Sequence, residues 1–353
     1  MMTNIQENEF INFLTSMYTR SPLQLNAMHE SDAEIIHPWN GAEHMLALTT
    51  DSIVEEIATG LYDDPYLIGW MTVMVNLSDL AAVGAKPIGM LVSEIFPSNY
   101  CESSLIRLQK GIQDACNECD VYILGGDTNY GEKLMLTGSA LGYLSTGQVL
   151  TRKGCHPGDL VYATSRLGTG NSFALAHFLG SHKQHILYKP VARLKEGQVL
   201  RGIATACMDT SDGVLATLDQ LMRINTCGFQ LDADWESALD KQSWHLVKEI
   251  EFPSWLLLAG EHGEFELLFT LPPDREQQFL HDAERSNFYP VKLGTVIPET
   301  SIYVPIDGQN MSIDTAWIRN LGQKVNSDVK HYIHNLLSYH DLLKKGAFNY
   351  ATT

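Results

Sequence analysis

Five short segments place carboxylate side chains beside small polar residues or glycines, a pattern typical of sites that bind metal ions and phosphate groups. Mg²⁺ prefers oxygen ligands in near-octahedral geometry and shares them among carboxylates, waters and substrate phosphates. Aspartates from separate segments could therefore converge on bound Mg²⁺. The segments are Ser31-Asp32, Thr50-Asp51, Asn76-Leu77-Ser78-Asp79, Gly125-Gly126-Asp127-Thr128 and Asp209-Thr210-Ser211-Asp212-Gly213.

Each segment also has a purely local explanation, because aspartate and serine cap helices and Gly-Asp pairs form turns. Asp79 is the exception. It falls inside an apolar stretch, residues 66–83, that predicts a helix, and an unpaired carboxylate buried there would be costly. Asp79 therefore requires a partner, and a metal ion is one candidate.

Two of the segments could contact phosphate through the backbone. Gly125 and Gly126 follow a predicted strand, and their lack of a side chain would let backbone amides approach an anion. Ser211 to Gly213 precede a predicted helix, whose N-terminal end favours negative charge. The sequence has neither a GxxxxGK[ST] loop nor a GxGxxG motif, and no GxSxG or HExxH motif supports a hydrolase or a zinc protease.

Charge and composition narrow the class of protein. Lys and Arg number 24 against 42 Asp and Glu in 353 residues, a net charge of −18, which disfavours nucleic acid as a partner. An anionic substrate would need bridging cations. The longest apolar run, residues 67–75, is far shorter than a membrane span, and the N-terminus does not resemble a secretory signal. We therefore expect a soluble protein. Six cysteines are too sparse for a disulfide scaffold, so we expect it in the cytoplasm.

The elements that must position the acidic segments are predicted by apolar periodicity. Strands and helices alternate without strict βαβ repetition, which favours an α+β fold. We expect an N-terminal domain over residues 1–148, a C-terminal α+β domain over 149–325 and a helical tail over 326–353. Helices are predicted over 8–18, 66–83, 101–119, 171–179, 191–204, 214–223, 274–285 and 328–345, and strands over 45–51, 88–96, 121–124, 134–144, 160–164, 229–231, 265–271 and 289–296, with a short strand ending at Met208.

Six stretches of the chain resemble, in the same order, the signature segments of thiamine-monophosphate kinase. The stretches are TTDSIVEE, GWMTVMVNLSDLAAVGAKP, LGGDTNYG, LTRKGCHPGDLVYAT, MDTSDGVLATL and FELLFTLP. That family belongs to the superfamily of aminoimidazole ribonucleotide synthetase, which also contains selenophosphate synthetase and a hydrogenase maturation factor. The resemblance implies two α+β domains, a homodimer whose N-terminal domains pair into a β-barrel, and Mg-ATP bound between the domains.

The resemblance also implies roles for individual residues. The metal ligands would be Asp32, Asp51, Asp79, Asp127, Asp209 and Asp212. Contacts to ATP would come from Thr50, Gly125, Gly126, Thr128, Arg152 and Ser211. Asp127, Asp212 and Arg152 would take part directly in catalysis, and the reaction would be in-line transfer of the γ-phosphoryl group of ATP to a small phosphorylated acceptor, thiamine monophosphate in that family.

The chain departs from the kinase pattern on the acceptor side. Ser31 stands where the kinases have an aspartate, Ala58 stands where they have a substrate-binding histidine, and residues 261–266 replace a Gly-Gly-Glu-Asp-Tyr-Glu motif. Two alternatives therefore stay open: an ATP-dependent synthetase or ligase acting on another metabolite, and a nucleotide-binding protein that has lost catalysis.

Overall fold

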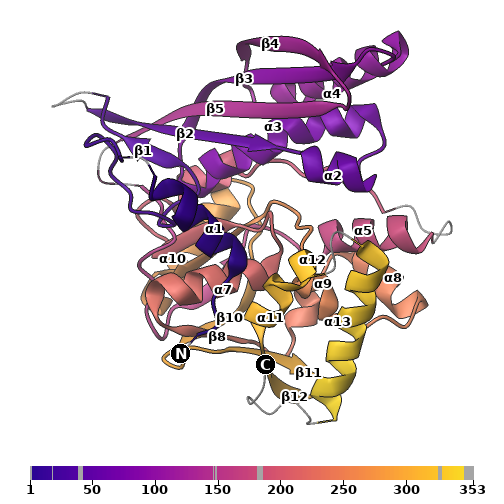
Figure 1. The fold of residues 1–353 in the computed structure, drawn as a ribbon. Coiled ribbons are helices and arrows are strands. Elements are labelled where there is room, and N and C mark those ends of the chain that lie inside the picture. The colour runs from indigo at the N-terminus through magenta and orange to yellow at the C-terminus, as the bar shows by residue number, and fades with distance from the viewer. Residues whose placement is uncertain are drawn as a thin grey trace.

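The computed structural model describes residues 2–17, 19–38, 43–145, 147, 149–180, 186–324 and 328–345. Two mixed β-sheets lie one above the other, with helices between them and on the outer face of the second sheet (Figure 1). The predicted α+β class is confirmed. No helix among the described residues has the length and apolarity needed to cross a lipid bilayer.

The first sheet has five strands among the described residues. Its order is β1 (Glu34–Ile36), β2 (His44–Ser52), β5 (Met135–Ser145), β3 (Lys86–Pro97) and β4 (Ile123–Gly131). Residues 23–25 are hydrogen-bonded to the outer edge of β1, whereas the outer edge of β4 has no partner strand in the described part of the chain. All neighbours are antiparallel except β3 and β4. Alternate residues of β5 are buried, as expected for a sheet with one covered face. Helices α3 (Pro65–Ala82) and α4 (Glu102–Glu118) cover that face.

Helix α3 is the element that carries Asp79, and two glycines fix its position. The side chain of Asp64 caps its first turn by accepting a hydrogen bond from the Tyr66 amide at 3.0 Å. Where α3 crosses α4, a Cβ atom on Gly69 or Gly111 would overlap a backbone carbonyl oxygen of the facing helix. The close crossing holds residues 76–79 between the two sheets.

The second sheet has seven strands. Its order is β12 (Gln309–Ile313), β11 (Ile302–Ile306), β8 (Gly228–Leu231), β10 (Val291–Ile297), β6 (Leu160–Ala163), β9 (Leu267–Leu271) and β7 (Ala206–Asp209). Only β8 and β11 pair in parallel. The remaining elements are α1 (Gln6–Thr15), α2 (Val54–Thr59), α5 (Thr169–Leu179), α6 (Leu194–Leu200), α7 (Val214–Asn225), η1 (Trp235–Ala238), α8 (Lys241–Glu249), α9 (Leu256–Ala259), η2 (Pro273–Arg275), α10 (Glu276–Arg285), α11 (Thr315–Arg319), α12 (Leu321–Lys324) and α13 (Val329–Lys344).

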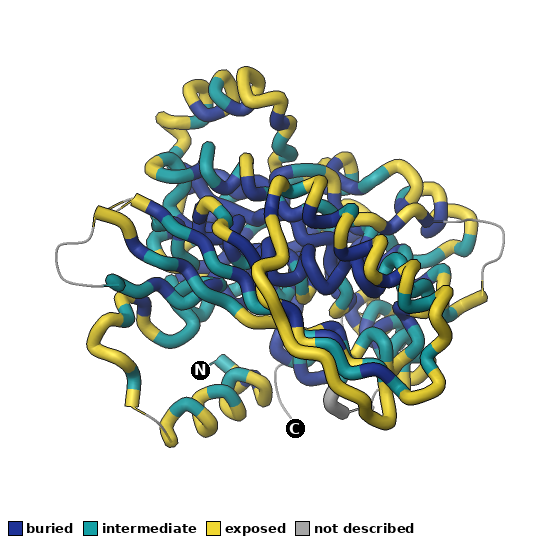
Figure 2. Tube along the Cα trace, turned by 90° about the horizontal axis from the view of Figure 1, so that it is seen from above, coloured by how far each residue is buried: buried dark blue, intermediate teal, exposed yellow. Residues whose placement is uncertain are grey.

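The two faces of the second sheet belong to different hydrophobic clusters. Tyr162 and Phe269 face α3, α6 and α10, and their cluster continues into the first sheet. Val161 and Leu268 face α7, α9, α11 and α13. Helix α3 is therefore packed between the sheets, and Figure 2 shows the buried centre that results, with exposed residues concentrated on outer helices and strand edges.

Two predicted elements differ from the structure in ways that affect the site. The strand expected over 121–124 is β4, which continues to Gly131, so residues 125–128 are strand rather than a turn. Glycine normally weakens a strand, but a Cβ on Gly126 would overlap the carbonyl of Val92, and its absence lets β4 pair closely with β3. The helix expected over 191–204 is confined to α6.

The remaining differences and agreements concern elements away from the site. The sequence did not predict helices α2, α8, α9, α11 and α12 or strands β1, β11 and β12, and all of these except α8 have at most six residues. Helix α13 confirms the helix expected over 328–345. Cys116 and Cys119 lie at the end of α4, as the sequence predicts.

Candidate active site

Three aspartates from distant parts of the chain meet between the sheets. Asp32 precedes β1, Asp79 lies in the last turns of α3, and Asp209 ends β7; one carboxylate oxygen of each lies within 4.8 Å of the other two. Three oxygen ligands at this spacing match what a hard divalent cation such as Mg²⁺ requires. These three predicted metal ligands are therefore brought together by the fold.

Hydroxyl groups from neighbouring elements orient the three carboxylates. Ser78 on α3 donates to Asp209 Oδ2 at 2.6 Å, and Ser211 donates to Asp209 Oδ1 at 2.8 Å. Thr49 on β2 donates to Asp79 Oδ2. Ser78 and Thr49 were not among the predicted site residues, although both directly precede residues that were.

Two further aspartates lie at the edge of this cluster. Asp51 is solvent-accessible at the end of β2, and its amide donates to Asn76 Oδ1 on α3 at 3.0 Å. Asp212 is exposed in the turn before α7. Both add negative charge to the cluster. The charge of Asp212 raises the pKa of Asp51, and the charge of Asp32 raises the pKa of Asp212.

Crowding of these groups changes their proton affinity. Partial desolvation by the surrounding residues, and then the charges of Asp209 and Asp212, raise the pKa of Asp51 to about 7. Burial and the charge of Asp32 raise the pKa of Asp209 to about 6. Burial and the neighbouring aspartates raise the pKa of Asp79 well above its usual range. A bound divalent cation would relieve this repulsion, so the residues fit Mg²⁺ in charge as well as in ligand type.

The metal-free protein is expected to lose stability as pH rises from 6 to 8. Carboxyls with folded-state pKa values above their unfolded values bind more protons when folded, so their deprotonation favours unfolding. The midpoint of thermal unfolding in EDTA should be higher at pH 6 than at pH 8, and Mg²⁺ should reduce the difference. Asp209→Asn should show a smaller pH difference than the wild type, and an unchanged difference would contradict this assignment.

Arg152 supplies a positively charged side chain to the aspartate cluster. Its guanidinium contacts both carboxylate oxygens of Asp32, with Nη2 2.9 Å from Oδ1 and Nε 3.2 Å from Oδ2. The Asp32 side chain is 1% exposed and that of Arg152 is 17% exposed. The Arg152 amide also donates to the Glu30 carbonyl at 2.7 Å, which holds the segment linking the two sheets against the Asp32 loop.

Replacing Arg152 by glutamine is expected to destabilise the metal-free protein by about 3 kcal/mol, because the Asp32 carboxylate would stay buried without its counter-charge. Asp32→Asn in the same chain should recover most of the loss. Urea unfolding of the wild type, both single variants and the double variant in EDTA measures the coupling. Purely additive effects would show that the pair is not energetically linked.

Four predicted site residues lie away from the aspartate cluster in the folded chain. Gly125, Gly126, Asp127 and Thr128 are on β4, at the outer edge of the first sheet. Asp127 pairs with the exposed Ser93, whereas the preceding pair, Gly126 and Val92, faces the helices. Asp127 therefore lies on the face turned away from α3, and roughly 14 Å, three strand spacings, separates its strand from the strand of Asp51. Within one chain, these β4 residues do not join the aspartate cluster.

Thr50 and Ser31 are held by their own hydrogen bonds. Thr50 Oγ1 donates to the Gly138 carbonyl at 2.8 Å and accepts from Ser139 Oγ at 3.0 Å, so it lies on the face opposite Asp51. Ser31 Oγ donates to the Ala33 carbonyl at 2.8 Å. Ser31 therefore shapes the turn that presents Asp32.

The loop that carries Asp209 to Asp212 is supported by residues 263–266. The Gly263 amide donates to the Ser211 carbonyl at 2.9 Å, and Thr210 and Glu266 exchange two hydrogen bonds through their backbones and the Thr210 hydroxyl. Glu266 in turn binds Arg193 through both carboxylate oxygens. These supporting residues were missed as site residues, although residues 261–266 had been recognised as a variant motif.

His262 belongs to the same segment and carries no charge. Its Nε2 lies 3.4 Å from Tyr62 Oη, and its ring packs against Phe173 and Tyr188. Burial lowers its pKa to about 3. A neutral imidazole at this place can hydrogen-bond but cannot supply positive charge to a substrate phosphate.

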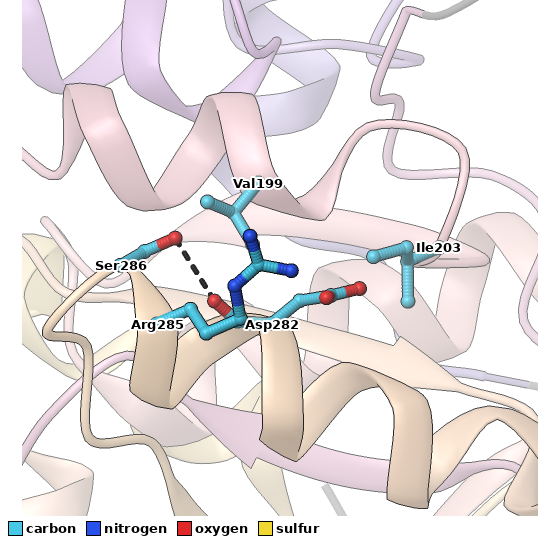
Figure 3. Close-up of a pocket in the computed structure, with 5 residues that line it drawn as sticks. All are labelled: Val199, Ile203, Asp282, Arg285 and Ser286. Carbon is cyan, nitrogen blue, oxygen red and sulfur yellow. Dashed lines mark hydrogen bonds between the residues drawn. The ribbon is translucent and has the colours of Figure 1, made fainter.

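A pocket separate from the aspartate cluster opens between α6 and α10. It is lined by Val199, Ile203, Asp282, Arg285 and Ser286, and Ser286 Oγ donates to the Asp282 carbonyl at 2.9 Å (Figure 3). One carboxylate beside one guanidinium leaves no excess charge for a phosphate. This pocket has none of the predicted site residues and is not the candidate active site.

Comparisons with known proteins identify relatives in sequence and in fold. The family described as "AIR synthase related protein, N-terminal domain" matches residues 30–144. Thiamine-monophosphate kinase of Escherichia coli (strain K12) is 32% identical over 238 residues, which are 64% of this chain and 71% of that protein. The enzyme of Pyrococcus horikoshii is 30% identical over 277 residues, 77% of this chain and 84% of that protein. A solved structure, "AaThiL complexed with AMPPCP and TMP", has a TM-score of 0.71 at 21% identity and covers 88% of this chain and 96% of that one.

The class defined by this fold and by the aspartate cluster is therefore that of the AIR synthase-related proteins. Within that class, the chain belongs to the thiamine-monophosphate kinase family.

Proposed function

We propose that this protein transfers the γ-phosphoryl group of ATP to thiamine monophosphate and so forms thiamine diphosphate and ADP. The convergence of Asp32, Asp79 and Asp209 supports this most directly, because phosphoryl transfer depends on charge neutralisation and positioning rather than on a protein nucleophile. Membership of the kinase family favours this reaction over a synthetase reaction on another metabolite.

Bound Mg²⁺ would neutralise phosphate charge as it develops during transfer. Asp32, Asp79 and Asp209 would hold it, with Asp51 and Asp212 at the edge of the site. Arg152 would exchange part of its contact with Asp32 for a phosphate oxygen. Ser211 and the amides before α7 would orient the phosphate chain.

Turnover of the purified protein tests this proposal. Mg-ATP and thiamine monophosphate should give ADP and thiamine diphosphate in equal amounts, and a reaction without the acceptor should give neither. Asp274→Asn, a change in a surface turn of η2, is a matched control that should keep full activity. Mg-ATP binding without thiamine diphosphate formation would contradict thiamine monophosphate as the acceptor.

We further propose a division into residues 1–148, 149–325 and 326–353, and a homodimer in which the N-terminal domains pair into a β-barrel. Strand β4 is exposed along its whole length. Large exposed apolar side chains lie on it or near it: Ile88, Leu91, Tyr122, Ile123, Leu124, Tyr130 and Met135. An open edge with so much apolar surface is a liability unless a partner covers it.

The partner strand would be β2 of a second copy. Strand β1 pairs with β2 only at residues 46–48, so the outer edge of β2 at residues 49–52 has no partner strand among the described residues. Pairing this edge with β4 of the second copy would close an eight-stranded barrel from two four-stranded halves and would bring the partner's β4, the strand of Asp127, next to the end of β2 that carries Asp51. The proposed metal-ligand role of Asp127 would therefore require the second copy of the chain.

Complementation between two inactive variants should detect this shared site. Mixing Asp127→Asn with Asp209→Asn, after mild dissociation and reassembly, should restore roughly a quarter of wild-type activity. Half of the dimers would be mixed, and each would have one intact site of two. Activity that stays at the level of the separate variants would place Asp127 and Asp209 in the site of one chain.

A further inference from the structure

Two cysteines meet behind the candidate active site. Cys155 follows the segment that carries Arg152, and Cys227 follows the end of α7; their Sγ atoms are 3.5 Å apart and both residues are buried. The two cysteines are 72 residues apart in the sequence. Cys155 is three residues from Arg152, and helix α7 connects Cys227 to Asp212, so each thiol is linked through the chain to a different part of the aspartate cluster.

Asn225 holds the two stretches together beside the thiols. Its Oδ1 accepts from the Gly154 amide at 2.7 Å, and its Nδ2 donates to the Arg152 carbonyl at 2.8 Å. The residues directly before the cysteines, Gly154 and Thr226, both have positive φ angles, of 132° and 52°. The hydrogen bonds of Asn225 thus join the two turns that carry the thiols, so the position of the thiols does not depend on side-chain packing alone.

We propose that Cys155 and Cys227 form a reversible disulfide on oxidation by a hydroperoxide, and that this bond lowers the affinity of the site for Mg-ATP. The first step is attack of the Cys227 thiolate on the terminal peroxide oxygen, which gives a sulfenic acid and releases the alcohol, or water from hydrogen peroxide. The Cys155 sulfur then attacks the sulfenic sulfur and displaces water, and its proton leaves with that water. In total, two thiols and one hydroperoxide give one disulfide, one alcohol and one water. A dithiol reductant reverses the reaction by exchange.

The pKa shifts of the two thiols favour Cys227 as the thiol that reacts first and Cys155 as the one that reacts second. The hydrogen bond from Cys155 lowers the pKa of the Cys227 thiol, and the same contact raises the pKa of Cys155. Cys227 is thus the better nucleophile, and Cys155 is the resolving thiol.

The bond changes the site because the sulfurs must approach each other by about 1.5 Å. Arg152 is three residues from Cys155 and pairs with Asp32, and α7 connects Cys227 to Asp212. A shift of the two turns would strain the Asn225 hydrogen bonds and displace Arg152. The effect on nucleotide affinity rests on the proposed function, whereas formation of the disulfide does not.

The experiment uses the full chain with Cys101→Ser. Cys101 is exposed, and hydrogen bonds with Ser103 and Ser104 lower its pKa to about 7, so it would otherwise react first. After treatment with hydrogen peroxide, intact mass should fall by about 2 Da, and non-reducing peptide mapping should find Cys155 linked to Cys227. The dissociation constant for Mg²⁺ with a non-hydrolysable ATP analogue should rise at least fivefold and return with dithiothreitol.

Two variants make the result specific. Cys227→Ser in the same background should lose both the mass change and the affinity change, whereas Cys119→Ser, which alters a partly buried thiol outside this pair, should keep both. A peroxide-treated protein without the Cys155–Cys227 linkage would overturn the proposal. Linkage with unchanged analogue affinity would overturn its regulatory half, and absence of analogue binding in the reduced protein would count against the proposed function instead.

Discussion

Asp209→Asn is expected to reduce kcat by about 10³-fold or more and, at the same time, to raise the melting temperature of the metal-free protein. Asparagine preserves the size of the side chain. Its Oδ1 can accept from one of the two serines, Ser78 or Ser211, and its Nδ2 can donate to the hydroxyl of the other. It lacks the charge that holds the cation, and a bound metal contributes several kcal/mol of transition-state stabilisation.

The gain in stability has the same physical origin as the loss of activity. Asp209 is buried beside Asp32 and Asp79, and its burial together with repulsion from the charge of Asp32 raises its pKa to about 6. Without a metal, removal of one charge relieves that repulsion, so the melting temperature in EDTA at pH 8 should rise by about 2 °C. Mg²⁺ should raise the melting temperature of the wild type more than that of the variant.

Steady-state kinetics and thermal unfolding with and without Mg²⁺ measure both effects. Asp274→Asn serves as the control, because it removes one acidic charge at the surface, away from the aspartate cluster. A variant that loses activity and also melts lower in EDTA would indicate that Asp209 is a structural residue. A variant that keeps its activity would remove Asp209 from the metal site.

Gly263→Ala is expected to destabilise the protein by about 3 kcal/mol and to abolish detectable turnover. A Cβ atom at position 263 would overlap the carbonyl oxygen of Thr210 and come within 2.9 Å of the Ser211 carbonyl oxygen. Both neighbours are backbone atoms of the loop between Asp209 and Asp212, so no side-chain rotation can relieve the clash. The loop must move, and its aspartates move with it.

A second glycine separates backbone strain from this steric effect. Gly308 has a φ of 78° and open space around its ideal Cβ position, so Gly308→Ala should cost about 1 kcal/mol and leave turnover unchanged. Urea unfolding and turnover of both variants provide the comparison. Wild-type activity in Gly263→Ala would show that the contact between residues 263 and 210 does not position the site.

The predictions from sequence succeeded where the signal is local. Helix α3 was expected over 66–83 and is found at Pro65–Ala82, because its long apolar pattern and its proline at the first position act within one element. Helix α7 and the loop before it were found for the same reason. Strand β4 was misjudged, since its glycines predict a turn unless the close approach of β3 is known.

Sequence by itself determined the α+β class, the acidic segments and the family, because element type and motif order are properties of neighbouring residues. The tertiary structure alone decided that Asp32, Asp79 and Asp209 share one site, that Arg152 pairs with Asp32, and that Asp127 lies on another strand edge. The physical reason is that strand order and helix packing bring together residues far apart in the chain. One step along a strand reverses the face on which a side chain lies, and one place in strand order moves it by about 5 Å.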